Sequence, residues 1–233
     1  MYAKQINERS PLRVFERSIH GGLGPGNLGV VLSRPGVGKT SFLVGIALDD
    51  LMRNEVFHVA LDQSVDHVRA YYDEIFSDLA RTMHLEEAAS VRLQVERSRL
   101  VHTYLGHSFS MVKLKNALGS LRDHLHFEPA LVVIDGFDFG GDHYDEVSEM
   151  RQIVRRIHCE LWMSARPSPN APVPQSGQLP HPLFRYADLL SVVVSLEPVG
   201  DRVRLDLVKD HDNQDLSDLY LDLDPQTMLL IER

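Results

Sequence analysis

Short apolar runs separated by segments of helical periodicity make up most of this chain. Residues 30–32, 56–61 and 130–134 are mainly apolar runs of the length of a strand. The third run is the most apolar, as expected of a central parallel strand that is covered on both faces. Residues 100–105 and 160–164 are less uniform and predict two further strands.

Apolar residues at helical spacing predict helices between these strands, at residues 40–52, 65–79, 85–97, 111–125 and 147–157. Ser64 and Ser110 directly precede two of these segments. A serine hydroxyl in this position accepts a hydrogen bond from a backbone N–H of the first helical turn. We therefore expect both serines to be helix N-caps.

The pattern changes toward the C-terminus. Residues 166–182 are rich in Pro, Ser and Gln and predict an exposed loop. Residues 189–196, 203–208 and 219–223 then alternate or run apolar, like antiparallel strands. Strands that alternate with helices first, followed by hairpins, predict an α/β fold with a mostly parallel central sheet, flanking helices and a C-terminal antiparallel extension.

The composition fits one α/β domain with a sizeable core. The chain has 233 residues, of which 43% are hydrophobic and 24% charged, and we divide it into an N-terminal lead (residues 1–20) and a domain (residues 21–233). No apolar run approaches the roughly 18 residues of a membrane-spanning helix, and the polar start lacks the apolar core of a secretory signal. Cys159 is the single cysteine, so it forms no intrachain disulfide and no Cys-rich metal site. We expect a cytoplasmic protein without a membrane partner.

The strongest chemical signal is the loop that follows the predicted strand at residues 30–32. Residues 33–40 match the P-loop pattern G-x-x-x-x-G-K-[ST], with a serine in place of the first glycine. The two remaining glycines let the backbone turn so that successive N–H groups point into an anion-sized hollow. The lysine supplies positive charge for the β- and γ-phosphates, and the threonine hydroxyl suits Mg²⁺. The predicted nucleotide-binding residues are Ser33, Arg34, Pro35, Gly36, Val37, Gly38, Lys39, Thr40 and Ser41.

The second signal is the aspartate that ends the most apolar strand. Asp135 follows the run at residues 131–134, and ligands of open α/β sheets bind at the carboxyl ends of parallel strands. There its carboxylate is suited to hold the Mg²⁺ shell, as a Walker B aspartate does. We predict that Thr40 and Asp135 bind Mg²⁺ and that Lys39 and Asp135 are catalytic. A structural role for Asp135 is the alternative.

Residues 21–40 (GGLGPGNLGVVLSRPGVGKT) resemble the entry to RecA-like P-loop ATPases of the DnaB helicase and KaiC type. The resemblance continues more loosely through Asp135 to residues 207–211 and covers most of the chain. It implies a RecA-like fold, with ATP and Mg²⁺ as cofactors. A base-reading N-K-x-D motif of GTPases is not apparent, which also favours ATP.

The resemblance assigns three further residues. Asp62 stands where the family has a glutamate that activates the attacking water, and we predict it as catalytic; a strand-end or capping role, with Gln63 orienting the water, is the alternative. Ser164 corresponds to a polar γ-phosphate sensor, although a structural serine fits equally well. Lys209 matches the lysine of a Lys-x-Arg pair that reaches into a neighbouring subunit, but His211 replaces the arginine. A solvated strand-end lysine is the alternative.

The sequence thus predicts a Mg²⁺-dependent ATP-binding protein, a slow ATPase that acts as a switch or assembly factor. The resemblance implies a homo-oligomer, with a hexamer among the candidates, and a protein partner that the sequence does not identify. A nucleotide-binding interaction protein without hydrolysis is the alternative. A DNA-dependent motor is the third hypothesis, which the net charge of −9 disfavours because nucleic-acid binding relies on Lys and Arg.

Overall fold

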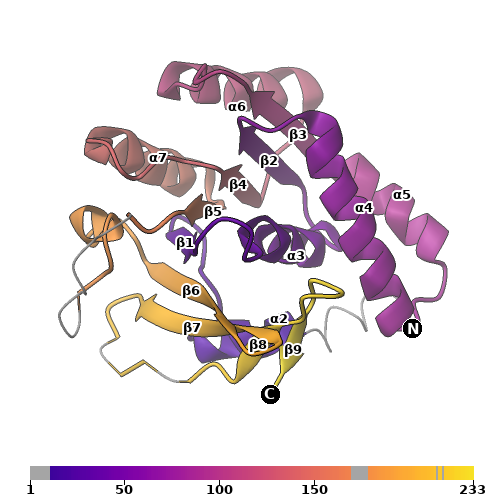
Figure 1. The fold of residues 1–233 in the computed structure, drawn as a ribbon. Coiled ribbons are helices and arrows are strands. Elements are labelled where there is room, and N and C mark those ends of the chain that lie inside the picture. The colour runs from indigo at the N-terminus through magenta and orange to yellow at the C-terminus, as the bar shows by residue number, and fades with distance from the viewer. Residues whose placement is uncertain (1–10, 169–177, 214, 217) are drawn as a thin grey trace.

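A nine-stranded sheet is the centre of the computed structural model, which describes residues 11–168, 178–213, 215–216 and 218–233 (Figure 1). The strand order is β3-β2-β4-β5-β1-β6-β7-β8-β9. The strands are β1 (Leu28–Leu32), β2 (Val56–Leu61), β3 (Arg99–Tyr104), β4 (Leu131–Asp135), β5 (Glu160–Ala165), β6 (Val192–Val199), β7 (Arg202–Asp210), β8 (Leu221–Leu223) and β9 (Leu230–Glu232).

The sheet divides into a parallel part and an antiparallel edge. All neighbours from β3 to β6 are parallel, whereas β7, β8 and β9 pair antiparallel. The predicted α/β architecture, with its C-terminal antiparallel extension, is therefore confirmed. The short strand β9 was not predicted, and residues 169–177 of the predicted exposed loop lie outside the described part of the chain.

Helices cover both faces of the sheet, as continuous apolar strands require. The helices are α2 (Pro11–Ser18), α3 (Lys39–Leu51), α4 (Val65–Thr82), α5 (Ala88–Ser98), α6 (Met111–Leu125) and α7 (Tyr144–Ile157), with a 3-10 turn at Leu183–Tyr186. In Figure 1, α3, α4 and α5 lie on one face of the sheet and α6 and α7 on the other. Right-handed crossovers explain this division. The connections from β1 to β2 and from β2 to β3 run toward one edge of the sheet, whereas those from β3 to β4 and from β4 to β5 run in the opposite direction.

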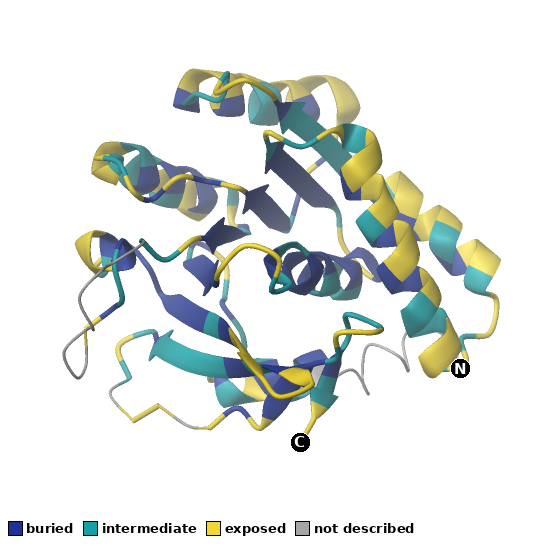
Figure 2. Cartoon of the chain, in the orientation of Figure 1, coloured by how far each residue is buried: buried dark blue, intermediate teal, exposed yellow. Residues whose placement is uncertain are grey.

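Both predicted N-caps are present. The Ser64 hydroxyl accepts a hydrogen bond from the His67 N–H at 3.2 Å, and the Ser110 hydroxyl accepts one from the Lys113 N–H at 3.3 Å. These bonds satisfy N–H groups that the helix itself leaves unpaired. Figure 2 shows the helices buried toward the sheet and exposed outward. Among the described helices, none is both long and apolar enough to cross a bilayer.

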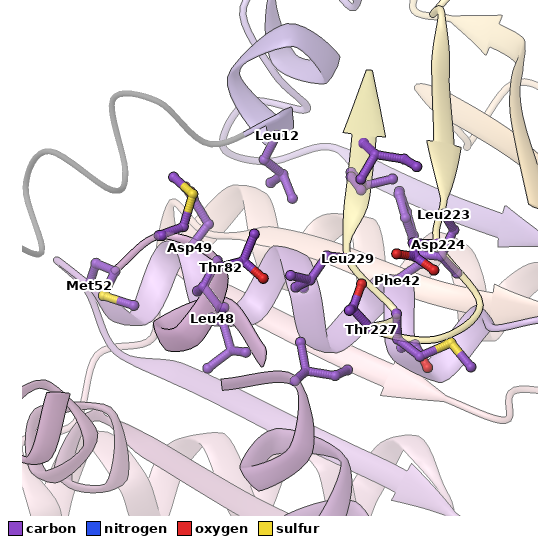
Figure 3. A pocket seen from close by; sticks show the side chains of 18 residues that line it. Leu12, Phe42, Leu48, Asp49, Met52, Thr82, Leu223, Asp224, Thr227 and Leu229 are labelled. Atoms are coloured by element: carbon purple, nitrogen blue, oxygen red, sulfur yellow. The ribbon is translucent and has the colours of Figure 1, made fainter. Parts of the chain in front are cut away.

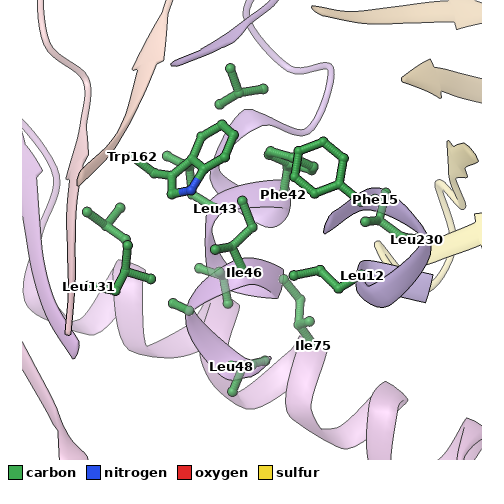
Figure 4. Close-up of a cluster of buried hydrophobic side chains, with 14 of the residues drawn as sticks. Leu12, Phe15, Phe42, Leu43, Ile46, Leu48, Ile75, Leu131, Trp162 and Leu230 are labelled. Carbon is green, nitrogen blue, oxygen red and sulfur yellow. The ribbon is translucent and has the colours of Figure 1, made fainter. Parts of the chain in front are cut away.

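The core between α3 and the sheet is built around one tryptophan. The Trp162 ring lies 6.0 Å from both the Phe15 and the Phe42 rings, measured between centroids, and Figure 4 shows the three side chains packed together. Trp162 extends over Gly29 of the neighbouring strand, where a Cβ atom would lie 2.7 Å from the indole ring. The absent side chain of Gly29 therefore makes room for the largest residue of this core.

Phe15 belongs to α2, within the segment predicted as an N-terminal lead. Phe15 and Ile19 are almost completely buried, at 2% and 0% exposure. The part of the predicted lead that the structure describes therefore contributes to the core of the domain. Residues 1–10 lie outside the described part.

Glu160, at the start of β5, carries a partly buried carboxylate. It accepts a hydrogen bond from the Gly24 N–H at 3.0 Å. Burial, followed by the charge of Asp50, raises the pKa of Glu160 from its usual 4.5 to about 7. Because the folded state holds this proton more tightly than the unfolded state, the carboxylate destabilises the protein as pH rises from 4.5 through 7.

Replacing Glu160 by glutamine is therefore expected to stabilise the protein at pH 8 by about 1–2 kcal/mol, with little effect at pH 4.5. Glutamine keeps an oxygen that accepts from Gly24 and removes the charge. Urea unfolding of both proteins at the two pH values measures this difference. A stability gain of equal size at both pH values would contradict the assignment.

Candidate functional site

Residues 33–38 form a tight loop between β1 and α3, and two of its glycines have conformations that other residues rarely adopt. Gly36 has a φ of 79° and Gly38 a φ of 118°. At Gly38 a Cβ atom would also lie 2.6 Å from a methyl group of Leu223 on β8. The backbone angle therefore favours glycine at Gly38, and a larger residue would also have to displace the end of the Leu223 side chain.

The loop leads directly into the N-terminus of α3. Gly38 is the N-cap and offers no side chain to the first helical turn. The first N–H groups of a helix have no partner within the helix, and the helix dipole adds partial positive charge there. A glycine-rich loop followed by such a helix end suits an anion of the size of a phosphate.

Lys39 bends back over this loop. Its Nζ atom donates to the Ser33 carbonyl at 2.7 Å and to the Arg34 carbonyl at 3.0 Å. Burial lowers the pKa of Lys39 to about 8, with Arg166 lowering it further and Asp135 opposing the shift. The ammonium group thus sits at the loop, and its charge is lost as pH rises through 8.

Asp135 is the centre of a polar network at the end of β4. Its Oδ2 atom accepts hydrogen bonds from the Thr40 hydroxyl at 2.6 Å and from the Gln63 amide at 3.1 Å. Its Oδ1 atom accepts from the Ser164 hydroxyl at 2.6 Å, and that hydroxyl accepts from the Gly136 N–H at 2.8 Å. Asp135 is 3% exposed, so these hydrogen bonds compensate for the burial of its carboxylate.

The topology explains why these residues meet. Strands β2, β4, β5 and β1 are consecutive in the sheet and parallel, so their carboxyl ends share one edge. The helix after β1 covers one face of the sheet and the helix after β4 covers the other. Ligands of open α/β sheets bind where the connections diverge in this way.

The oxygens of Thr40 and Asp135 form a donor set for a hard cation. Mg²⁺ prefers oxygen ligands, and proteins typically provide it with one or two side chains while phosphate oxygens and water complete the shell. One hydroxyl and one carboxylate in contact fit that requirement. The chemistry of these side chains therefore agrees with the predicted Mg²⁺ ligands.

Asp62 lies outside this network. Its carboxylate accepts a hydrogen bond from the Gly106 N–H at 2.8 Å and is 3.8 Å from His107 Nδ1. A left-handed backbone, with a φ of 59°, accompanies this orientation toward the loop after β3. Gln63, which the sequence indicates only as an alternative residue to orient the water, contacts Asp135 instead.

Lys209 also lies apart from the network. Its ammonium group donates to the Leu190 carbonyl at 2.6 Å and to the Ala187 carbonyl. His211 is likewise engaged within its own chain, with Nδ1 2.8 Å from Asp210 and Nε2 3.1 Å from the Leu23 carbonyl. Lys209 and His211, which the resemblance assigns to contacts with a neighbouring subunit, therefore both make contacts within their own chain.

Arg166 is a further residue of interest that sequence reasoning did not include. It follows Ala165, whose carbonyl accepts from the Ser33 N–H at 3.3 Å, and its charge acts on Lys39. The sequence alone gives only the position of this arginine after a strand, which is a weak signal.

Comparison with known proteins identifies no family for this chain. A scan against protein-family models found no match, and a search of curated proteins found none either. The loop, Lys39 and the network at Asp135 therefore carry the functional conclusion.

Proposed function

We propose that this protein binds ATP with Mg²⁺ through the loop at residues 33–41 and hydrolyses it slowly, as a switch or assembly factor. The observation that carries the proposal is the 2.6 Å contact between Thr40 and Asp135, beside the Lys39 ammonium group. Two distant parts of the sequence, residues 33–40 and Asp135, thus bring a glycine-rich loop, an ammonium group and two oxygen-bearing side chains together at one sheet edge. Lys39 and the loop N–H groups would hold the phosphates, and Thr40 and Asp135 the metal.

The strand order supports a RecA-like ATPase over other classes of P-loop protein. Strand β5 lies between the strand that leads into the loop and the strand that ends in Asp135. It carries Ser164 to the same edge, where the hydroxyl contacts Asp135. A polar side chain in this position would respond to changes at the γ-phosphate through the Asp135 carboxylate.

Slow hydrolysis follows from the groups near Asp135. Efficient general-base catalysis needs a base within hydrogen-bonding reach of the attacking water. The Asp62 carboxylate is engaged with Gly106, whereas the Gln63 amide beside Asp135 can orient a water molecule but cannot accept its proton. We therefore propose Gln63 as the residue that positions the water.

The same observation favours a second function, in which the protein binds nucleotide without hydrolysis and uses it to control assembly or a partner. Phosphate release separates the two. Its dependence on protein concentration also tests the proposed homo-oligomer: turnover per molecule that rises with concentration indicates a site completed between subunits, whereas constant turnover indicates a site within one chain. A DNA motor is less favoured, since the chain is acidic overall.

Calorimetric titration with ATP, with and without Mg²⁺, tests the proposal. We expect Mg²⁺ to tighten binding to the parent protein by at least about tenfold, and Asp135→Asn to remove most of this gain because it replaces a carboxylate ligand by an amide. Asp138→Asn is the matched control, because Asp138 is exposed and lies three residues beyond Asp135.

Two results would contradict the proposal. One is the absence of ATP binding at millimolar concentrations, which would show that the loop is not a nucleotide site. The other is an equal gain in ATP affinity on adding Mg²⁺ to the parent protein and to Asp135→Asn, which would show that Asp135 is not a Mg²⁺ ligand.

A further inference from the structure

A cavity lies beside α3, and the residues of the network at Asp135 do not line it. It has a volume of about 210 Å³, is partly open to solvent and is bordered by α2, α3, α4 and the β8–β9 hairpin. Figure 3 shows Leu12, Phe42, Leu48, Met52 and Leu229 directed toward it. Its remaining lining residues are Ser41, Gly45, Asp49, Ile75, Leu79, Thr82, Met83, Leu223, Asp224, Thr227, Met228, Leu230 and Ile231.

Gly45 contributes to this space from the middle of α3. A glycine inside a helix costs about 0.5–1 kcal/mol relative to alanine. A Cβ atom at Gly45 would have no neighbouring atom within 4 Å, so close packing does not require this glycine. The absence of a side chain at Gly45 instead leaves additional space in the cavity beside α3.

The lining indicates the kind of molecule that fits. The walls are mainly aliphatic, and three of them are methionines, whose flexible side chains adapt to ligands of different shape. Polar groups are few: the carboxylates of Asp49 and Asp224, and the hydroxyls of Ser41, Thr82 and Thr227. The Asp49 carboxylate is paired with the Arg13 guanidinium, so the Asp224 carboxylate is the group that disfavours an anion, and the hydroxyls offer hydrogen bonds to a neutral end group.

We propose that this cavity binds a small, uncharged molecule with an aliphatic or aromatic body of about ten non-hydrogen atoms and one hydrogen-bonding end. An apolar cavity of roughly 150 Å³ already suffices to bind benzene, so this volume suits a somewhat larger body. The occupant would contact Leu223, the same side chain that packs on Gly38 of the candidate loop. The cavity shares Ser41 with the segment proposed to bind nucleotide, but its other lining residues lie outside that segment.

Titration of the full chain with 1-octanol, without nucleotide, tests the proposal. We expect saturable binding of one molecule with a Kd on the order of 0.1 mM, which is typical for a ligand of this size. Octanoate, which has the same chain length and a carboxylate end, should bind at least about tenfold more weakly, because its carboxylate would lose hydration on entering an apolar pocket and would be repelled by Asp224. Chemical shifts of the methionine methyl groups provide a local readout.

Gly45→Leu is the decisive variant, since it fills the cavity from within. It should abolish octanol binding, while Gly45→Ala, which adds one methyl group, should weaken binding a few fold. Gly119→Leu is the matched control: Gly119 is also an interior glycine of a helix with open space at its Cβ position, but it lines a different groove, between α6 and α7. Circular dichroism confirms that each variant is folded.

The absence of saturable octanol binding to the parent protein would overturn the proposal. So would unchanged binding in folded Gly45→Leu, or an equal loss in Gly119→Leu, because either result would place the octanol elsewhere. If Gly45→Leu fails to fold, unchanged octanol binding in Gly45→Ala has the same meaning. Failure of ATP binding, in contrast, affects only the proposed function.

Discussion

Replacement of Lys39 by alanine is expected to weaken Mg·ATP binding at least 100-fold and to abolish phosphate release. The Lys39 ammonium group donates to the carbonyls of Ser33 and Arg34, at the two ends of the Ser33–Arg34 step of the loop. When phosphate is bound, these donors would turn to the β- and γ-oxygens. Each charge-assisted hydrogen bond contributes about 1.5–3 kcal/mol, so the loss of two accounts for a 100-fold change or more.

The pH dependence gives this prediction a second readout. The pKa of Lys39 is lowered to about 8, chiefly by burial. Because only the protonated amine attracts phosphate, ATP affinity of the parent protein should fall by about tenfold between pH 7 and pH 9. The fall should be absent in Lys39→Ala, which has no amine to lose its proton.

Isothermal titration of ATP at several pH values measures both effects. Lys115→Ala is a suitable control, because Lys115 is an exposed lysine that pairs with Glu149 on α7, away from the loop. Unaltered ATP affinity in folded Lys39→Ala would show that the loop does not bind phosphate. Such a result would contradict the proposed function but would not bear on the proposed binding of octanol.

The features that the sequence predicts well depend on interactions between residues that are close in the sequence or on the burial of a whole strand. Residues of the central strands are buried on both faces, so continuous apolar runs mark them, and 56–61 coincides with β2. Ser64 and Ser110 are predictable as helix caps because each hydroxyl bonds to a backbone N–H only three residues further along the chain. The position of Asp135 beside Thr40 follows from parallel strands that end at one edge.

The features that it misses depend on distant partners. Helix α2 is short and half of its residues are polar; among its side chains that the structure describes, Leu12 and Phe15 are buried, as is Ile19 directly after the helix. Those side chains pack on residues from α3, β5 and the C-terminal hairpin, which no local pattern identifies. In a short segment the apolar residues needed for such packing are too few to reveal a helix.

The same limit applies to the candidate site. The loop and Asp135 are apparent because their chemistry is contained in short motifs. The direction of the Asp62 side chain depends instead on a left-handed backbone and on Gly106, and the position of Lys209 depends on the carbonyls of residues 187 and 190. A motif gives the residue at a position, whereas the fold decides what its side chain can reach.

Two glycine-to-alanine replacements should have opposite effects on stability. Gly29→Ala is expected to destabilise the protein by about 3 kcal/mol, because the new Cβ atom would lie 2.7 Å from the indole ring of Trp162. That ring is 2% exposed and packs between Phe15 and Phe42, so it has little room to move. Gly45→Ala should instead stabilise by up to about 1 kcal/mol, since it adds the same methyl group to a helix beside open space.

Thermal unfolding of both variants measures the difference, which for a chain of this length corresponds to a fall in Tm of about 6–12 °C for Gly29→Ala. The pair Gly29→Ala and Trp162→Phe tests the cause. Phenylalanine lacks the outer ring of the indole, so the double variant should be less destabilised than the sum of the two single variants by at least about 1 kcal/mol. Strict additivity, or a Gly29→Ala protein as stable as the parent, would contradict the close contact between β1 and β5.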